Sequence, residues 1–397
     1  MTFIKYFFYI FFVSTLSNSC AKHEKKLIAK TIVTKNGLLP IMTPFENNLP
    51  KLSLGYIESK KKSIESFVTQ NWINNSMNGS FLVAKNGQII YEKYQGIANR
   101  EKQIQIDSTT PIHIASVSKV ITATAVLLLI DAKKIDLDQK LNTILPTFPY
   151  PEISIKTLLN HRSGLKNYAY FTNNKKVWDS KKILSNQDVL NVLANNQIPL
   201  EFPTDSHFSY SNTNYAMLAL VIEKITDLKY DDAISKMIFN PLKMTNSYVF
   251  DFEKDKETAT PSYKWNNQKY ALDYLDAVYG DKNVYSTPKD LLKFDLARHS
   301  DNFLSADLRK KIYTGYSNER KGTKNYGLGI RMIEWETGEP FYFHNGWWHG
   351  NTSSFVMLGK EHVTIIALSN KFNHATYKVR NLAPLFGDYP FKVNDSI

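Results

Sequence analysis

The sequence contains little cysteine and little arginine, and both shortages exclude classes of protein. Its 397 residues hold one cysteine, Cys20, so the chain cannot form an internal disulfide bond. Only 7 of the 49 basic residues are arginine, whereas grooves that read phosphates or bases usually rely on arginine forks. The lysines are scattered, apart from short clusters such as Lys60-Lys61-Lys62. We therefore interpret the net charge of +12 as a lysine-rich solvated surface and expect no nucleic-acid partner.

The amino terminus lacks a hydrophobic run long enough to cross a membrane. One lysine precedes an apolar run from Tyr6 to Leu16, which fits the core of a secretory signal peptide over residues 1–19. The sequence Leu16-Ser17-Asn18-Ser19 then precedes Cys20, a pattern that resembles the cleavage site of a bacterial lipoprotein. We expect a lipid on Cys20, a membrane partner through that anchor, and a place on the periplasmic side of the cell envelope. A plain secretory signal with a free thiol and a retained membrane anchor are the alternatives.

Several catalytic signatures are missing as well. The sequence contains no Gly-x-Ser-x-Gly, no His-Glu-x-x-His, no P-loop and no dinucleotide fingerprint, and its nine histidines are dispersed. A nucleophile-elbow hydrolase, a zinc hydrolase and a nucleotide-dependent enzyme therefore have no support. We expect neither a metal nor a cofactor.

The order of the predicted elements indicates one catalytic unit with a split sheet. Asn86-Gly87 between two apolar runs predicts an early hairpin over residues 81–91. Helices are predicted at 63–74, 120–130, 155–160, 186–195, 214–226, 288–297 and 374–385, and late strands at 328–335, 340–343, 353–358 and 363–368. We expect an α+β fold in which an antiparallel sheet of early and late strands is flanked by helices, with a mostly helical second lobe.

The chain is predicted to divide into three parts. Residues 1–19 are the signal peptide, residues 20–60 the lipidated amino terminus and a polar tether, and residues 61–390 a catalytic domain of two lobes. A crevice between the lobes is the expected place for chemistry.

Ser116-Val117-Ser118-Lys119 is the first candidate for that chemistry. Residues i and i+3 of a helix lie about 5–6 Å apart on one face, so the lysine amine can take the proton of the Ser116 hydroxyl. The pattern Ser-x-x-Lys occurs five times, but only this copy follows a strand-like segment and opens a helix that is apolar all round. The alternative is a plain helix cap.

Two further motifs follow in the chain. Tyr210-Ser211-Asn212 precedes an apolar helix, and its tyrosine and asparagine can offer a proton donor or base and an amide for substrate, unless Asn212 only caps that helix. His344-Asn345-Gly346 follows a strand-like segment. Its glycine would let a ligand backbone approach an edge strand, although His344 could be an ordinary surface histidine.

Taken together, the three motifs resemble the serine β-lactamase and penicillin-binding-protein superfamily. The nearest branch groups class C β-lactamases with D-Ala-D-Ala carboxypeptidases, D-aminopeptidases and esterases. Secondary marks agree over about residues 60–390, namely Leu158-Leu159-Asn160-His161-Arg162-Ser163-Gly164-Leu165, Val284-Tyr285-Ser286-Thr287-Pro288-Lys289-Asp290-Leu291 and Tyr326-Gly327-Leu328-Gly329. The resemblance implies acyl transfer to Ser116 followed by hydrolysis of the acyl-enzyme, with no cofactor.

The resemblance also implies the role of each site residue. Ser116 is the nucleophile, Lys119 is its proton partner together with Tyr210, and the backbone N–H groups of Ser116 and Trp347 form the oxyanion hole. Asn212 helps to hold Lys119 and the substrate amide.

His344 and Gly346 would line the strand beside the substrate, where His344 can bind a carboxylate or hydrogen-bond Tyr210. Class C β-lactamases usually carry lysine where this chain has His344, which argues against a dedicated β-lactamase. Asn345 replaces the usual threonine, and Trp347-Trp348 is bulkier than the usual segment. The substrate is therefore left open among D-amino-acid peptides, esters and β-lactams. The alternative function is a penicillin- or peptidoglycan-binding sensor that keeps the fold without turnover.

Overall fold

The fold is organised by a seven-stranded antiparallel sheet. The computed structural model describes residues 31–34, 37–72, 77–319 and 322–391. The strand order is β10-β11-β12-β13-β14-β3-β4. The strands are β3 (Gly79–Lys85), β4 (Gln88–Gln95), β10 (Lys324–Tyr326), β11 (Arg331–Ile333), β12 (Phe341–Trp348), β13 (Asn351–Leu358) and β14 (Val363–Ser369). Early and late strands meet where β3 pairs with β14, so the predicted α+β class and split sheet are confirmed.

Both faces of the central strands are buried, which explains their continuous apolar sequence. In β3, Phe81 and Val83 pack into one core cluster, and Leu82 and Ala84 pack into the other. Side chains alternate across a strand, so each face needs its own apolar set. The hairpin from β3 to β4 turns at Asn86-Gly87, where both residues have positive φ, +52° and +71°, as a tight hairpin turn requires.

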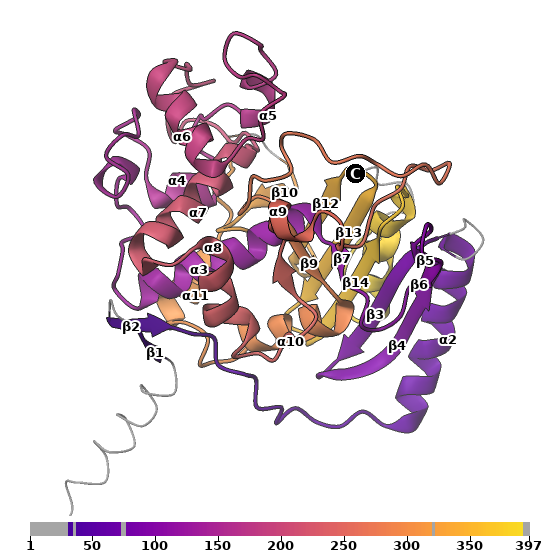
Figure 1. Cartoon of the computed structure of the whole chain (residues 1–397). Helices are drawn as coiled ribbons and strands as arrows, with labels where there is room; N and C mark the ends of the chain where they lie inside the picture. Colours follow the sequence, from indigo (N-terminus) through magenta and orange to yellow (C-terminus); the bar gives the residue numbers. More distant parts are fainter. Residues whose placement is uncertain (1–30, 35–36, 73–76, 320–321, 392–397) are drawn as a thin grey trace, which may run out of the picture.

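Helices cover the two faces of the sheet unequally (Figure 1). On one face lie α2 (Leu54–Asn71) and the 3₁₀ segment η5 (His374–Leu385). The other face meets the larger core of the helical lobe. That part includes α3 (Ser118–Asp131), α4 (Ile155–Leu159), α5 (Tyr168–Phe171), α6 (Asn186–Asn195), α7 (Asn212–Thr226), α8 (Tyr230–Ile234), α10 (Pro288–Arg298) and α11 (Ala306–Ile312). α3 is buried along nearly its whole length, as its sequence predicts.

Short elements complete the chain. Three strands form a second small sheet in the order β7-β9-β8, and two hairpins pair β1 with β2 and β5 with β6. Their bounds are β1 (Thr31–Thr34), β2 (Gly37–Pro40), β5 (Ile97–Asn99), β6 (Ile104–Gln105), β7 (Ile112–His113), β8 (Tyr248–Val249) and β9 (Val284–Ser286). The other short helical segments are the 3₁₀ segments η2 (Ala115–Val117) and η3 (Leu141–Thr143), the π-helical segment η4 (Ser235–Phe239) and the α-helix α9 (Phe252–Asp255).

The predicted tether over residues 20–60 is wrong for its second half. Met42 is buried and its N–H donates to the carbonyl of Met237. α2 begins at Leu54, with the Ser53 side chain capping it, rather than at residue 63. The chain is therefore folded onto the domain well before residue 61. The signal peptide over residues 1–19 and Cys20 lie outside the described residues.

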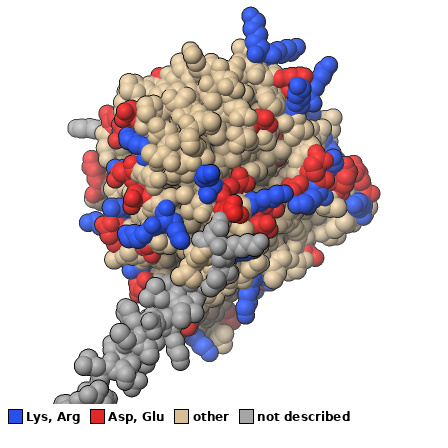
Figure 2. Space-filling model, turned by 60° about the vertical axis from the view of Figure 1, so that its left-hand side comes forward, with Lys and Arg blue, Asp and Glu red and all other residues tan. Residues whose placement is uncertain are grey.

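The last predicted helix is also different in kind, because η5 is a 3₁₀ segment with Pro384 inside it. Among the helices of the described ranges, none is both long and apolar enough to cross a membrane. On the face shown in Figure 2, basic and acidic side chains are intermixed rather than gathered by sign. That pattern fits the interpretation of the net charge as a solvated, lysine-rich surface.

Candidate active site

Ser116 lies at the tight entry to the buried helix α3. It sits in the 3₁₀ turn η2, and the preceding Ala115 has a positive φ of +48°, a rare conformation for a residue with a side chain. The Ile114 N–H donates to the carbonyl of Val284 and fixes the approach to the turn. Ser116 is therefore held partly exposed at the mouth of an otherwise buried helix.

Lys119 lies one turn further along and is completely buried. Its Nζ donates to Ser116 Oγ at 3.2 Å, to Asn212 Oδ1 at 2.8 Å and to the backbone carbonyl of Asp281 at 2.7 Å. In the described ranges no carboxylate lies within ion-pair distance of this amine. The Ser-x-x-Lys and Tyr-Ser-Asn motifs are thus brought together, around an amine surrounded by neutral acceptors.

Tyr210 and Asn212 stand at the start of α7. Asn212 is the first residue of that helix and Ser211 occupies the cap position, so the side chain of Asn212 is used on Lys119 rather than as a cap. Lys119 Nζ lies 5.0 Å from the centroid of the Tyr210 ring. The Tyr210 hydroxyl is buried and has no hydrogen-bond partner within the described part of the chain. A buried hydroxyl without a partner is costly, so a bound group is the natural acceptor or donor for it.

His161 lies just before Ser163-Gly164-Leu165, and its side chain supports the loop that bears Tyr210. The ring is buried, and its Nδ1 accepts the backbone N–H of Ser211 at 3.2 Å and lies 3.0 Å from Asn214 Nδ2. Burial, with the charges of Lys119 and Arg331, holds the pKa of His161 well below its usual range. A neutral His161 therefore accepts hydrogen bonds that fix the loop bearing Tyr210.

The structure does not place His344 where the resemblance implied. The ring is fully buried, with Nε2 3.1 Å from the Tyr326 hydroxyl and Nδ1 2.8 Å from the carbonyl of Asn345. The hydrogen bond expected between His344 and Tyr210 is absent from the described contacts, and His344 does not line the cavity beside Ser116. Burial, Arg331 and Lys119 lower the pKa of His344 well below its usual value, so the ring is neutral.

Gly346 does lie beside the nucleophile. A Cβ on this residue would come within 2.5 Å of the carbonyl oxygen of Ile114 and 2.9 Å of the Ser116 nitrogen. The glycine therefore lets strand β12 approach the turn that carries Ser116. The Ser353 hydroxyl on β13 donates to the same carbonyl of Ile114 at 2.6 Å, which locks the sheet to this turn.

A cavity of about 780 Å³ opens over these groups. The predicted residues on its wall are Ser116, Tyr210, Asn212, Gly346 and Trp347. Trp347 is 63% exposed and Tyr170 is 74% exposed, so both aromatic rings form part of the rim.

Arg331 is the wall residue that sequence reasoning missed. It lies on β11 opposite Phe343 of β12, and its guanidinium carbon is 4.7 Å from the centroid of the Tyr210 ring. No acidic side chain of the described residues forms an ion pair with Arg331. Lys324 and Arg380 also line the cavity. The sequence did carry a signal for this residue: arginine is scarce, and Arg331 is one of seven and lies on a predicted strand of the late sheet.

The chain matches one known protein family and is similar to several known proteins. Residues 65–385 match the family described as Beta-lactamase. The chain is 29% identical to Penicillin-binding protein 4* of Bacillus subtilis over 81% of its own length and 74% of that protein. It is 26% identical to a Teichoic acid D-alanine hydrolase of Staphylococcus aureus, over 80% and 75% of the two chains. The crystal structure of a penicillin-binding protein from Bacillus halodurans has the same fold, with a TM-score of 0.70, 22% identity, and coverage of 80% and 99%.

Proposed function

Because the chain belongs to the Beta-lactamase family, we propose that it is a serine hydrolase that forms an acyl-enzyme on Ser116. The observation that carries the proposal is the position of Lys119 Nζ, 3.2 Å from Ser116 Oγ and held from behind by Asn212 and the carbonyl of Asp281. This is the geometry of a nucleophile with an adjacent base that is itself oriented by other groups.

We propose an acylation step in which each of these groups has one role. Ser116 Oγ attacks the substrate carbonyl carbon as its proton passes to Nζ of Lys119. The negative charge that develops on the carbonyl oxygen is stabilised by the backbone N–H groups of Ser116 and Trp347. The Tyr210 hydroxyl donates a proton to the leaving group as the bond to it breaks, and regains one from the Lys119 ammonium. Water then attacks the ester on Ser116, a proton of that water passes to Ser116 Oγ as its bond to the acyl carbon breaks, and the acid is released.

Arg331 favours a substrate with a free carboxylate next to the bond that is cleaved. Its guanidinium lies on the wall of the cavity close to Tyr210 and has no acidic partner in the described residues. A charge in a partly desolvated site is stabilised by an opposite charge, and arginine matches a carboxylate with two parallel hydrogen bonds. Among the substrate classes left open, we therefore propose a peptide or related compound that ends in a D-amino acid. The similarity to an S. aureus protein named Teichoic acid D-alanine hydrolase is consistent with a D-alanyl group.

Labelling with a fluorescent penicillin and intact-protein mass spectrometry test the proposal. We expect one adduct on the wild-type protein and none on Ser116→Ala. An adduct that persists in Ser116→Ala, or none on the wild type with penicillin or with a fluorophosphonate, would overturn it. Hydrolysis is then compared on a D-Ala-D-Ala peptide, p-nitrophenyl esters and nitrocefin. A stable complex without hydrolysis of any of them would support the alternative, a binding or sensor protein.

We also propose that the protein is a lipoprotein of the bacterial cell envelope, attached through Cys20. Support comes from the apolar run that ends at Leu16 and the position of the single cysteine. Metabolic labelling with a palmitate analogue tests this. Label should appear on the wild type and be lost in Cys20→Ser, and an unlabelled wild type would contradict the proposal.

A further inference from the structure

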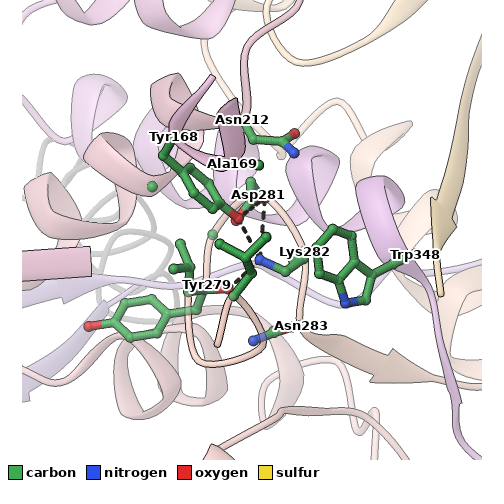
Figure 3. Close-up of polar contacts among 12 residues, drawn as sticks. Tyr168, Ala169, Asn212, Tyr279, Asp281, Lys282, Asn283 and Trp348 are labelled. Carbon is green, nitrogen blue, oxygen red and sulfur yellow. Dashed lines mark hydrogen bonds and ion pairs between the residues drawn. The ribbon is translucent and has the colours of Figure 1, made fainter. Parts of the chain in front are cut away.

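A second buried lysine lies directly behind the candidate site. Lys282 is 2% exposed, and its Nζ donates to the Tyr168 hydroxyl at 2.5 Å and to the carbonyl of Val278 at 3.1 Å. The carboxylate of Asp281 lies 3.7 Å away and accepts a hydrogen bond from the same Tyr168 hydroxyl at 3.0 Å. Figure 3 shows these three side chains together, with Lys282 between Tyr168 and Trp348. None of them contacts Ser116 in the described structure, so the mechanism above leaves them without a role.

The segment that carries Asp281 and Lys282 is fastened along α3. The Thr122 hydroxyl donates to the carbonyl of Gly280 at 2.6 Å, and the N–H of Val284 donates to Ser118 Oγ at 3.1 Å. Between these two points the carbonyl of Asp281 accepts the hydrogen bond from Lys119. The position of the Lys119 amine therefore depends in part on the orientation of the peptide group that joins Asp281 to Lys282.

The side chains on either side of that peptide group are both tied to Tyr168. The carboxylate of Asp281 precedes the peptide bond and the amine of Lys282 follows it, and each bonds the Tyr168 hydroxyl. Two anchors on one hydroxyl leave the peptide little freedom to rotate. From this geometry we propose that Lys282 is a positioning residue, which together with Asp281 and Tyr168 aims the Asp281 carbonyl at Lys119. This inference rests on the proposed function of Ser116 and Lys119.

Lys282 also supports the opposite wall of the cavity. Its Nζ lies 4.6 Å from the centroid of the Trp348 ring, a cation–π contact, and the Trp348 Nε1 donates to Asp276 Oδ1 at 2.6 Å. Trp348 follows Trp347, whose backbone N–H is assigned to the oxyanion hole. The amine of Lys282 thus contacts both Tyr168, which helps to position Lys119, and Trp348 at the end of strand β12.

Stability is a poor explanation for this cluster. Burial lowers the pKa of Lys282, and the opposing negative charges of Asp281 and Asp276 do not fully offset this effect. Asp281 Oδ1 is buried and makes no hydrogen bond with any described residue. Replacing a buried ion pair with apolar residues is often neutral or stabilising, whereas a small misplacement of a catalytic group can cost a hundredfold in rate.

Steady-state hydrolysis by Lys282→Met tests the inference, with the substrate that the wild type turns over fastest. We expect kcat to fall at least tenfold while KM stays within twofold, because Lys282 does not itself line the cavity and its loss acts mainly on the position of the base. Tyr168→Phe keeps the volume and removes one hydroxyl, so it should lower kcat three- to tenfold. Lys282→Arg keeps the charge and donors and should recover part of the rate lost in Lys282→Met.

Thr364→Val is the matched control for lost stability. It removes a buried hydroxyl that donates to Asp295 at 2.5 Å, on β14 and away from the cavity. It should lower Tm and leave kcat within twofold. If Lys282→Met and Tyr168→Phe both fold and keep the wild-type kcat, the inference is wrong although the proposed function stands. If the wild type itself forms no acyl-enzyme, the proposed function fails and the inference falls with it.

Discussion

The guanidinium carbon of Arg331 lies 4.7 Å from the centroid of the Tyr210 ring, at the wall of the cavity that holds Ser116. Strand pairing produces this contact, since Arg331 stands opposite Phe343 on the neighbouring strand β12. A cation over an aromatic face is weakly attracted to it, but its strongest partner would be an anion. Arg331, the proposed carboxylate site, therefore lies next to Tyr210, the proposed proton donor.

Arg331→Gln should separate charged from uncharged substrates. We expect kcat/KM for a D-Ala-D-Ala peptide to fall about 10- to 100-fold, the loss of one charged hydrogen-bonding partner. The same substitution should change kcat/KM for a neutral p-nitrophenyl ester less than about threefold, because that substrate offers no carboxylate. Arg309→Gln is the control, since Arg309 pairs with Asp301 away from the cavity. An equal loss on both substrates would contradict the assignment.

Lys119→Ala and Tyr210→Phe should slow acylation without unfolding the protein. Removing the base or the proton donor is expected to lower the rate of labelling by fluorescent penicillin by roughly 10²- to 10⁴-fold. Tyr210→Phe loses no described hydrogen bond, so its Tm should stay close to that of the wild type. Lys119→Ala leaves the oxygens of Asn212 and Asp281 without a donor and should lower Tm measurably. Near-normal labelling rates in either variant would exclude that residue from the proposed mechanism.

Local spacing predicted the centre of the site better than its walls. Ser116 and Lys119 meet because a helix brings i and i+3 together, and that relationship needs no tertiary information. His344 was misplaced because the predicted strand stopped at residue 343, whereas β12 continues to Trp348. Within a strand, neighbours face opposite ways. Phe343 and Asn345 therefore share the face that lines the cavity, and His344 lies on the face that it shares with Gly346, where its ring is buried against Tyr326.

The contacts of Lys119 with Asp281 and of Tyr210 with Arg331 could not be derived from the chain alone. Each joins residues more than a hundred positions apart, through a backbone carbonyl in one case and a ring face in the other. Neither leaves a local pattern in the sequence. The same holds for the folded segment before α2, where Leu39 and Met42 are buried in the larger core by contacts with residues far along the chain.

Acid should destabilise the protein through its buried histidines. Burial is the largest cause that lowers the pKa of His113, to about 4, and it also lowers the pKa values of His161 and His344. In the unfolded chain these residues have a pKa near 6.5, so below that pH the unfolded state binds protons that the folded state does not. The free energy of unfolding should therefore fall by about 1.4 kcal/mol per pH unit for each such histidine.

Urea unfolding between pH 7.5 and pH 5 measures this slope. Burial lowers the pKa of His299, but Asp295 outweighs burial and raises it overall, so His299 opposes the trend. His113→Gln should flatten the slope by about one proton's worth below pH 6.5. His299→Gln should remove the stability gained as the pH falls towards 6.5 and leave the slope below pH 6.5 unchanged. A slope that is the same in His113→Gln as in the wild type would show that this histidine is not held neutral.

Gly346→Ala should damage both folding and acylation, for a steric reason. The added Cβ would lie 2.4 Å from Ser353 Oγ, 2.5 Å from the carbonyl oxygen of Ile114 and 2.9 Å from the Ser116 nitrogen. Two of these atoms are backbone and cannot rotate away, so β12 must move from the turn that holds the nucleophile. We expect a loss of about 1–3 kcal/mol in the free energy of unfolding, with slower labelling by fluorescent penicillin.

Gly55→Ala is the matched control, because Gly55 lies in the first turn of α2 and a Cβ there would meet nothing within 4 Å. That variant should keep its labelling rate and unfold no more easily than the wild type. Equal behaviour of the two alanine variants would mean that the close approach of β12 to Ser116 is not required.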